Sequence, residues 1–158
     1  MKWKDVFDKW GLKTIKLNAK FAELEFQPED VDKDAAWKLY VELITRVSTQ
    51  TLLPEEGDEE TALTSIYELF GITREILKEE GRECIEFTKL AVIVLNQVIR
   101  PFTAKWHRLS LQGAFNNKER CDEFRKELAD LQIKLRNYTK LLAEVAQVED
   151  LTDITEEA

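Results

Sequence analysis

Residues that build the common catalytic and metal sites are scarce in this sequence. Its 158 residues include one histidine, His107, and two cysteines, Cys84 and Cys121, whose separation matches no metal-binding or redox spacing. A Cys–His zinc site is therefore excluded, and the HExxH sequence, the glycine-rich phosphate loops and the paired Glu-x-x-His ligands of a di-iron bundle do not occur. We expect no metal and no cofactor. Sequence alone leaves a Cys84–Cys121 disulfide open, and we favour two free thiols.

Turn-forming residues and long apolar runs are also few. Five glycines and three prolines favour long helices over many short strands. The longest uninterrupted apolar run, residues 90–95, is too short to cross a bilayer, and the N-terminus has no apolar signal-peptide core. We therefore expect a cytoplasmic protein.

Positive charge is outweighed by negative charge, but the two are unevenly distributed. The net charge is −8, although residues 1–20 contain six lysines against two aspartates. The rest of the chain is therefore strongly acidic and would repel phosphates, so we expect no general binding to nucleic acid. Its acidic clusters lack the ligand spacing of a calcium loop and are interpreted as solvated charge.

Helical periodicity is the strongest pattern that is present. Apolar residues recur with alternating gaps of four and three along one stretch: Phe124, Leu128, Leu131, Leu135, Tyr138, Leu142 and Val145. This a/d spacing predicts a long helix that packs a narrow stripe against other helices. We favour the core of an intramolecular bundle over a dimer interface. The stripe would serve both purposes if Leu141, at its edge, were exposed.

The whole pattern predicts a mainly α protein with a four-helix-bundle-like single domain over residues 1–147. The bundle, residues 34–147, is expected to hold helices over about 34–52, 59–80, 83–111 and 117–147. The expected helix caps and stops are Asp32 or Asp34, Asp58, Gly81, Gly113, and Asn116 or Asn117. Pro101 predicts a kink or break after Ile99. The first helix is expected to bury Trp37 and Tyr40, and residues 148–158 to form an acidic flexible tail.

Two further elements are expected before the bundle. Residues 1–11 form an amphipathic helix with Trp3, Phe7 and Trp10 on one face. We favour packing of this face on the domain; the alternative is attachment to a membrane surface or a partner. Residues 12–27 alternate apolar and polar side chains, which predicts a β-hairpin turning at Ala19-Lys20.

One segment, residues 100–108, combines cationic and aromatic side chains within the acidic body. It contains Arg100, Lys105, Trp106, His107 and Arg108. Seven helical steps return Arg100 and His107 to within about 20° of each other, so both would face one groove. Cations beside aromatic rings suit an anion, a phosphate or a flipped base. We favour the structural alternative, in which Trp106 fills the core while Arg100 and His107 pair with carboxylates.

The spacing of Arg100 and His107 resembles the arginine–histidine signature of HEPN proteins, an all-helical superfamily that includes metal-independent ribonucleases. In that family the arginine and the histidine, with four to six residues between them, meet their counterparts in a dimer groove and act on the RNA phosphodiester. The resemblance covers only residues 100–107. It implies a symmetric dimer with Arg100 and His107 as catalytic residues. Pro101 departs from the family pattern, in which a small polar residue commonly follows the arginine.

The scarcity of catalytic residues favours a non-enzymatic function. We interpret the protein as an interaction or regulatory protein that binds a protein partner, or a second copy of itself, through a helical face, the N-terminal segment or the acidic tail. A HEPN-like ribonuclease or toxin using Arg100 and His107 is one alternative. Peripheral membrane association through Trp3, Phe7 and Trp10 is the other.

Overall fold

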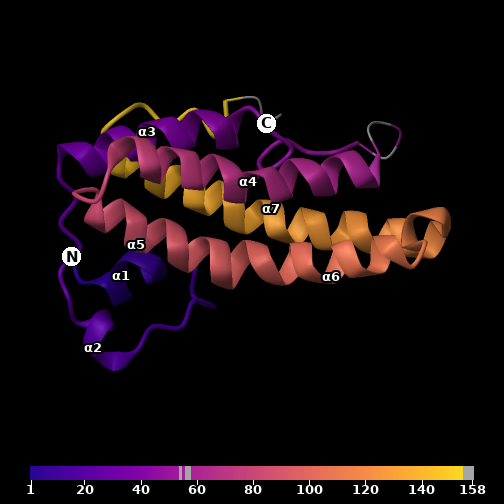
Figure 1. Ribbon diagram of the computed structural model, residues 1–158, viewed down its shortest axis with the longest axis horizontal. Helices are drawn as coiled ribbons and strands as arrows, with labels where there is room; N and C mark the ends of the chain where they lie inside the picture. Colours follow the sequence, from indigo (N-terminus) through magenta and orange to yellow (C-terminus); the bar gives the residue numbers. More distant parts are fainter. Residues whose placement is uncertain (54, 56–57, 155–158) are drawn as a thin grey trace.

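The computed structural model describes residues 1–53, 55 and 58–154, and within these ranges the chain is helical with no strand. The long elements are α3 (Asp30–Ile44), α4 (Glu59–Glu80), the consecutive α5 (Ile85–Val94), η1 (Leu95–Ile99) and α6 (Arg100–Leu111), and α7 (Lys118–Ala146). They run side by side along the length of the molecule, with α1 and α2 at one end (Figure 1). The predicted mainly α fold is confirmed.

The a/d stripe of α7 lies in the core. All seven of its residues are buried, and so is Leu141, which is only 1% exposed. The stripe therefore faces the other helices of the same chain, and Leu141 does not extend it to the surface. This arrangement matches the bundle interpretation.

α3 begins and ends earlier than predicted because of contacts that lie beyond its own sequence pattern. The buried carboxylate of Asp32 accepts hydrogen bonds from the Glu29 amide (2.8 Å) and from the Phe87 amide in the first turn of α5 (2.9 Å). Past Ile44, the Ser48 and Thr49 hydroxyls both donate to the Leu43 carbonyl at 2.8 Å. These bonds satisfy the end of α3, and residues 45–50 form turns where helix was predicted.

The other helix ends follow their local signals. Asp58 accepts from the Thr61 amide at the start of α4, and Asn117 accepts from the Arg120 amide at the start of α7. Gly81 and Gly113 follow α4 and α6 with φ values of 86° and 81°. Side-chain capping at the N-terminus and positive φ at the C-terminus are the expected devices, and the predictions at these four positions are confirmed.

Pro101 changes the helix type without stopping the helix. The five residues of η1 form a π-helical segment, and α6 follows it at once with proline in its first turn. Proline has no backbone N–H to donate to a carbonyl of the preceding turn. Because the hydrogen bonds of a π-helical turn reach one residue further along the chain, that carbonyl can accept from a later amide. The predicted irregularity is therefore present as a π-helical turn, and residues 100–108 lie on one continuous α-helix.

The β-hairpin predicted over residues 12–27 is wrong. Asn18 accepts a hydrogen bond from the Phe21 amide and begins α2 (Ala19–Ala22), where the hairpin turn was expected. The backbone N–H and C=O of Lys16 pair with the side-chain amide of Gln97, both at 2.8 Å, and not with a neighbouring strand. The alternation therefore belongs to an extended segment that packs its apolar side chains on the bundle.

The amphipathic N-terminal helix packs on its own domain. α1 (Trp3–Lys9) buries Trp3 completely, and the indole ring meets Phe7, Phe21 and Phe26 with centroid distances of 4.7–5.9 Å. Trp10 is partly buried. Trp3 and Phe7 face the interior, so their placement gives no support to membrane attachment.

The beginning of the acidic C-terminal segment runs back along α3 (Figure 1). The Tyr40 hydroxyl accepts from the Leu151 amide (2.7 Å) and donates to the Glu149 carbonyl (3.3 Å). Lys140 pairs with Asp153 at 2.6 Å. Within the predicted flexible tail, Glu149, Leu151 and Asp153 thus contact α3 and α7, and residues 155–158 lie outside the described residues.

Candidate functional site

Two of the five candidate anion-binding residues on α6 are fully accounted for by the structure of the bundle. Trp106 is fully buried, with its ring edge-on to Phe124 at 5.2 Å. Lys105 is exposed, but its amine pairs with Glu127 at 2.7 Å and Glu123 at 3.5 Å. Trp106 is therefore a core residue, and the charge of Lys105 is neutralised.

Arg100 and His107 both face α4, as their spacing predicts. The guanidinium of Arg100 lies 4.8 Å from the centroid of the Phe70 ring, and its Nε donates to Asn96. The His107 ring meets Tyr67 edge-on at 4.8 Å. Because Tyr67 and Phe70 are neighbours on α4, the cation and the imidazole lie against the same stretch of α4.

These two side chains do not take the carboxylate partners that the structural alternative expects. Within the described residues, neither Arg100, His107 nor the exposed Arg108 forms an ion pair. A guanidinium can bind a phosphate through two parallel hydrogen bonds, and an imidazole can transfer a proton near neutral pH. The pair could therefore bind an oxyanion. Among the described residues, no group of histidine, cysteine, aspartate or glutamate is placed to hold a metal ion.

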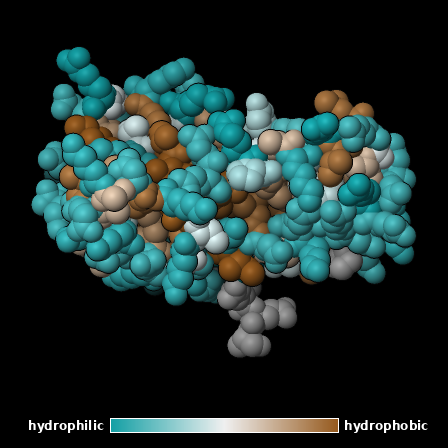
Figure 2. Space-filling view, turned by 90° about the horizontal axis from the view of Figure 1, so that it is seen from below, coloured by the Kyte–Doolittle hydropathy of each residue, from teal (hydrophilic) through white to brown (hydrophobic). Residues whose placement is uncertain are grey.

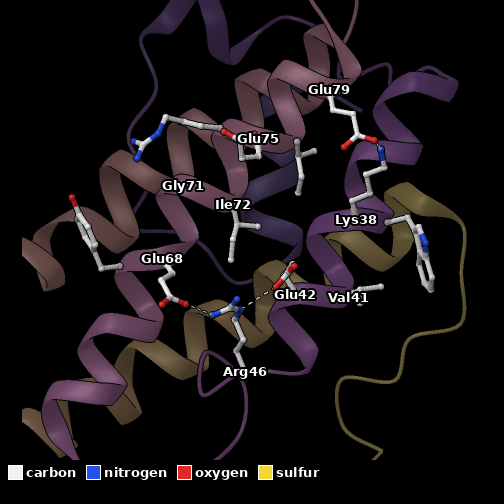
Figure 3. Close-up of a pocket in the computed structure, with 13 residues that line it drawn as sticks. Lys38, Val41, Glu42, Arg46, Glu68, Gly71, Ile72, Glu75 and Glu79 are labelled. Carbon is white, nitrogen blue, oxygen red and sulfur yellow. Dashed lines mark hydrogen bonds and ion pairs between the residues drawn. The ribbon is translucent and has the colours of Figure 1, made fainter.

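A larger feature, which the sequence patterns missed, is a groove of about 870 Å³ between α3 and α4 (Figure 3). We call it the α3–α4 groove. Val41 and Ile72 lie in its middle, and Gly71 contributes no side chain to the space above it. Trp37 and Tyr67, at opposite ends, are 47% and 49% exposed. Two large aromatic rings are thus presented to solvent beside an apolar depression.

The prediction that Trp37 is buried is wrong, and the reason lies in the geometry of α3. Its buried positions follow the strict helical spacing Asp32, Ala35, Ala36, Leu39, Tyr40 and Leu43. Trp37 lies one step off this stripe and stacks on Tyr40 at the surface, with a centroid distance of 5.9 Å. Because Trp37 is itself three residues from the buried Tyr40, helical spacing alone does not distinguish this exposed tryptophan from a buried one.

One cation lies between two carboxylates at each end of the α3–α4 groove. Figure 3 shows Arg46 between Glu42 and Glu68, and Lys38 beside Glu79. The Lys38 cluster consists of Lys38, Glu79 and Glu80, and the Arg46 cluster consists of Arg46, Glu42 and Glu68. The Lys38 amine lies 2.6 Å and 2.7 Å from its carboxylates. These hydrogen bonds, first to Glu79 and then to Glu80, raise the pKa of Lys38. Each cluster therefore carries one negative charge in excess.

A shallower hollow of about 420 Å³ lies between the N-terminal segment and α5. Figure 2 views the molecule from below and shows hydrophobic side chains in the left half of this face, where Figure 1 places α1, α2 and α5. The polar groups here already have partners: the Gln97 amide binds the Lys16 backbone, and Lys89 pairs with Glu86 at 3.3 Å. We interpret this hollow as the junction between the N-terminal segment and the bundle.

Comparisons of the chain with protein-family models, with curated proteins and with solved structures found no match. None of the helices in the described ranges is long and apolar enough to span a membrane. Two surfaces beside α4 are therefore the candidate sites: the α3–α4 groove, and the part of α6 that carries Arg100 and His107.

Proposed function

We propose that the protein is a non-enzymatic interaction protein that holds a helical segment of a partner protein in the α3–α4 groove. The observation that carries the proposal is the pair of half-exposed aromatic residues, Trp37 and Tyr67, at the two ends of this groove, which has apolar side chains in its middle and charged side chains around them. Tryptophan and tyrosine dominate the binding energy of many protein interfaces, and apolar depressions with a polar rim are typical of such sites.

The shape of the groove favours a helix as the bound segment. The ion pairs Lys38–Glu79 and Arg46–Glu68 show that α3 and α4 run antiparallel, since the earlier of the two cations meets the later carboxylate of α4 and the later cation meets the earlier carboxylate. Two antiparallel helices leave a groove into which the side chains of a third helix can interdigitate. The 15 residues of α3 extend about 22 Å, which matches four turns of a bound helix.

This proposal is tested by selecting peptides from a displayed library of helical sequences. The Val41→Asp variant places a charge in the groove, and Val92→Asp on α5 is the matched control because the two valines are similarly exposed, 37% and 43%. We expect peptides selected on the wild-type protein to bind at least about tenfold more weakly to Val41→Asp. Affinity for Val92→Asp should remain unchanged. Selected peptides that bind both variants equally, or a failure to select any, would contradict the proposal.

A second candidate function is a HEPN-like metal-independent ribonuclease. It is favoured by the placement of Arg100 and His107 against the same stretch of α4, where neither has a carboxylate partner among the described residues. Such an enzyme would use Arg100 to bind the phosphodiester and His107 to transfer a proton.

The ribonuclease hypothesis predicts cleavage of a fluorescent single-stranded RNA in the presence of EDTA. Cleavage should fall by at least about 100-fold in His107→Ala and in Arg100→Ala, because each removes a group that acts on the phosphate. Lys126→Ala is the control, since Lys126 is an exposed cation on α7 outside the candidate segment 100–108. Absence of cleavage by the wild-type protein, or equal cleavage by all variants, would rule this function out.

A further inference from the structure

Charge at the two ends of the α3–α4 groove points to the kind of helix that fits it. The inference rests on the proposed function. We infer that the bound segment is an amphipathic helix with an apolar stripe and a basic residue, lysine or arginine, beyond each end of that stripe.

Two carboxylates at the rim of the groove, Glu68 and Glu79, can each accept a hydrogen bond from a second cation. Glu68 contacts Arg46 through Oε2, and Glu79 contacts Lys38 through Oε1. The side chains of Glu68 and Glu79 are 52% and 66% exposed, so a second cation can approach the remaining oxygen of each. A carboxylate has enough lone pairs to accept from two cations at once.

The balance of charge also favours a helix with basic ends. With two carboxylates per cation, the Lys38 cluster and the Arg46 cluster are each negative, and the net charge of −8 adds to the field around them. A helix with acidic ends would meet repulsion at both ends of the groove, whereas a helix with basic ends would be attracted. Arg74, which also lines the groove, is on the same helix as Glu68 and Glu79 and lies between them in sequence, away from the two ends.

The spacing of the charged groups sets where the basic residues should lie. Lys38 lies on α3 and Arg46 lies two residues past the end of α3, eight residues further along the chain, whereas Glu68 and Glu79 are eleven residues apart on α4, which corresponds to about 16 Å. Val41 and Ile72 lie between these ends. The basic residues of the bound helix should therefore be two to three turns apart, with its apolar side chains on the turns between them.

The test uses three synthetic helices of about 16 residues with the same leucine stripe on an alanine-based background. They differ only in the residue beyond each end of the stripe, which is lysine, glutamine or glutamate. Binding to the full chain is measured by fluorescence anisotropy at low and high salt. We expect the lysine probe to bind about tenfold more tightly than the glutamate probe, with the glutamine probe between them. Added salt should reduce this difference.

Variants of the chain separate the role of charge from that of shape. The double substitution Glu68→Gln/Glu79→Gln should remove the preference for the lysine probe and leave the glutamine probe unaffected. The control Glu119→Gln/Glu144→Gln changes the net charge equally at exposed positions outside the groove, and it should preserve the preference.

The outcomes distinguish failure of this inference from failure of the proposed function. Equal binding of the three probes, lost in Val41→Asp, would leave the groove as a docking site and overturn the inference of basic ends. Binding of no probe, or binding that Val41→Asp does not change, would overturn both.

Discussion

Asp32 shows how much of this fold depends on a single side chain. Its carboxylate is 2% exposed and accepts from the Glu29 amide at the start of α3 and from the Phe87 amide in α5. One residue thereby satisfies backbone donors in the first turns of two helices and fixes their relative position.

We expect Asp32→Ala to lower the free energy of unfolding by about 2–4 kcal/mol, because the buried Phe87 amide and the partly buried Glu29 amide lose their acceptor. Asp32→Asn retains one acceptor oxygen and should cost less. Asp34→Ala is the matched control, since Asp34 is exposed on the same turn, and it should change stability by less than about 0.5 kcal/mol. Urea denaturation measures all three. Equal midpoints for Asp32→Ala and Asp34→Ala would contradict the assigned role.

The cysteines are free, as the sequence analysis favoured, and they should differ in reactivity. Burial, with the nearby Asp32 carboxylate, raises the pKa of Cys84 to about 12, so that roughly one thiol in 10⁴ is ionised at pH 8. Cys121 is partly exposed. In a Cys121→Ser variant, the remaining thiol should react with a disulfide reagent only as fast as the protein unfolds. Rapid reaction of Cys84 in the native protein would contradict its burial.

The residues of the candidate site differ in how far sequence could place them. Arg100 and His107 face the same stretch of α4 because helical spacing alone sets their angle, and the prediction needed no knowledge of neighbouring helices. The burial of Trp106 was one of two interpretations, since a tryptophan on an amphipathic helix fits either face. Trp37 was misplaced because its exposure depends on a shift of one residue in the stripe that α3 packs against α7.

At the scale of elements, α1 and α2 are held together by ion pairs as well as by the packing of Trp3 against Phe7, Phe21 and Phe26. Lys2 and Lys4 lie 2.6 Å and 2.9 Å from the Glu23 carboxylate, and their hydrogen bonds lower its pKa from 4.5 to about 2. Because the folded state has the lower pKa, the ion pairs stabilise the native contact above pH 4.5, and this contribution is lost as the pH falls towards 2.

We therefore expect acid to loosen the contact between α1 and α2 between pH 4.5 and 2. The reporter is the Trp3 amide, which donates to the Leu24 carbonyl at 2.9 Å. Its protection against hydrogen exchange should be lower in Glu23→Gln than in the wild type at pH 6, and the two proteins should converge at pH 2. Asp8→Asn, at an exposed position of α1, should behave as the wild type. A difference that persists unchanged at pH 2 would contradict the ion-pair explanation.

The sequence predicts a helix end correctly where the capping residue is a near neighbour in the chain. It does not where a side chain from a distant segment determines the residue at which the helix ends. Asp58 and Asn117 cap their helices through residues three positions away. The end of α3 instead depends on Gln132 of α7, which donates to the Val47 and Gln50 carbonyls at 2.6 Å and 2.9 Å and holds the following turns. The hairpin failed for the same reason, since Gln97 of η1 takes the place of a strand partner.

At the scale of the whole molecule, α7 joins the other long helices. Its buried stripe packs on α3, α4 and α6, whereas α1 and α2 attach at one end of the bundle (Figure 1). Stability should therefore be distributed unevenly, with the most protected amides along α7 and the least protected in residues 1–26.

The Leu135→Ala substitution tests this distribution. Leu135 is fully buried in the middle of α7, and its truncation should cost about 2–5 kcal/mol, because it leaves a cavity that the surrounding helices cannot fill. Ile133→Ala, at an exposed position on the same helix, should change stability by less than about 0.5 kcal/mol. If α7 opens only when the whole bundle unfolds, Leu135→Ala will accelerate hydrogen exchange of the slowest amides in every long helix by the same factor. Acceleration confined to α7 would show instead that the helix opens alone, and that the α3–α4 groove does not depend on it.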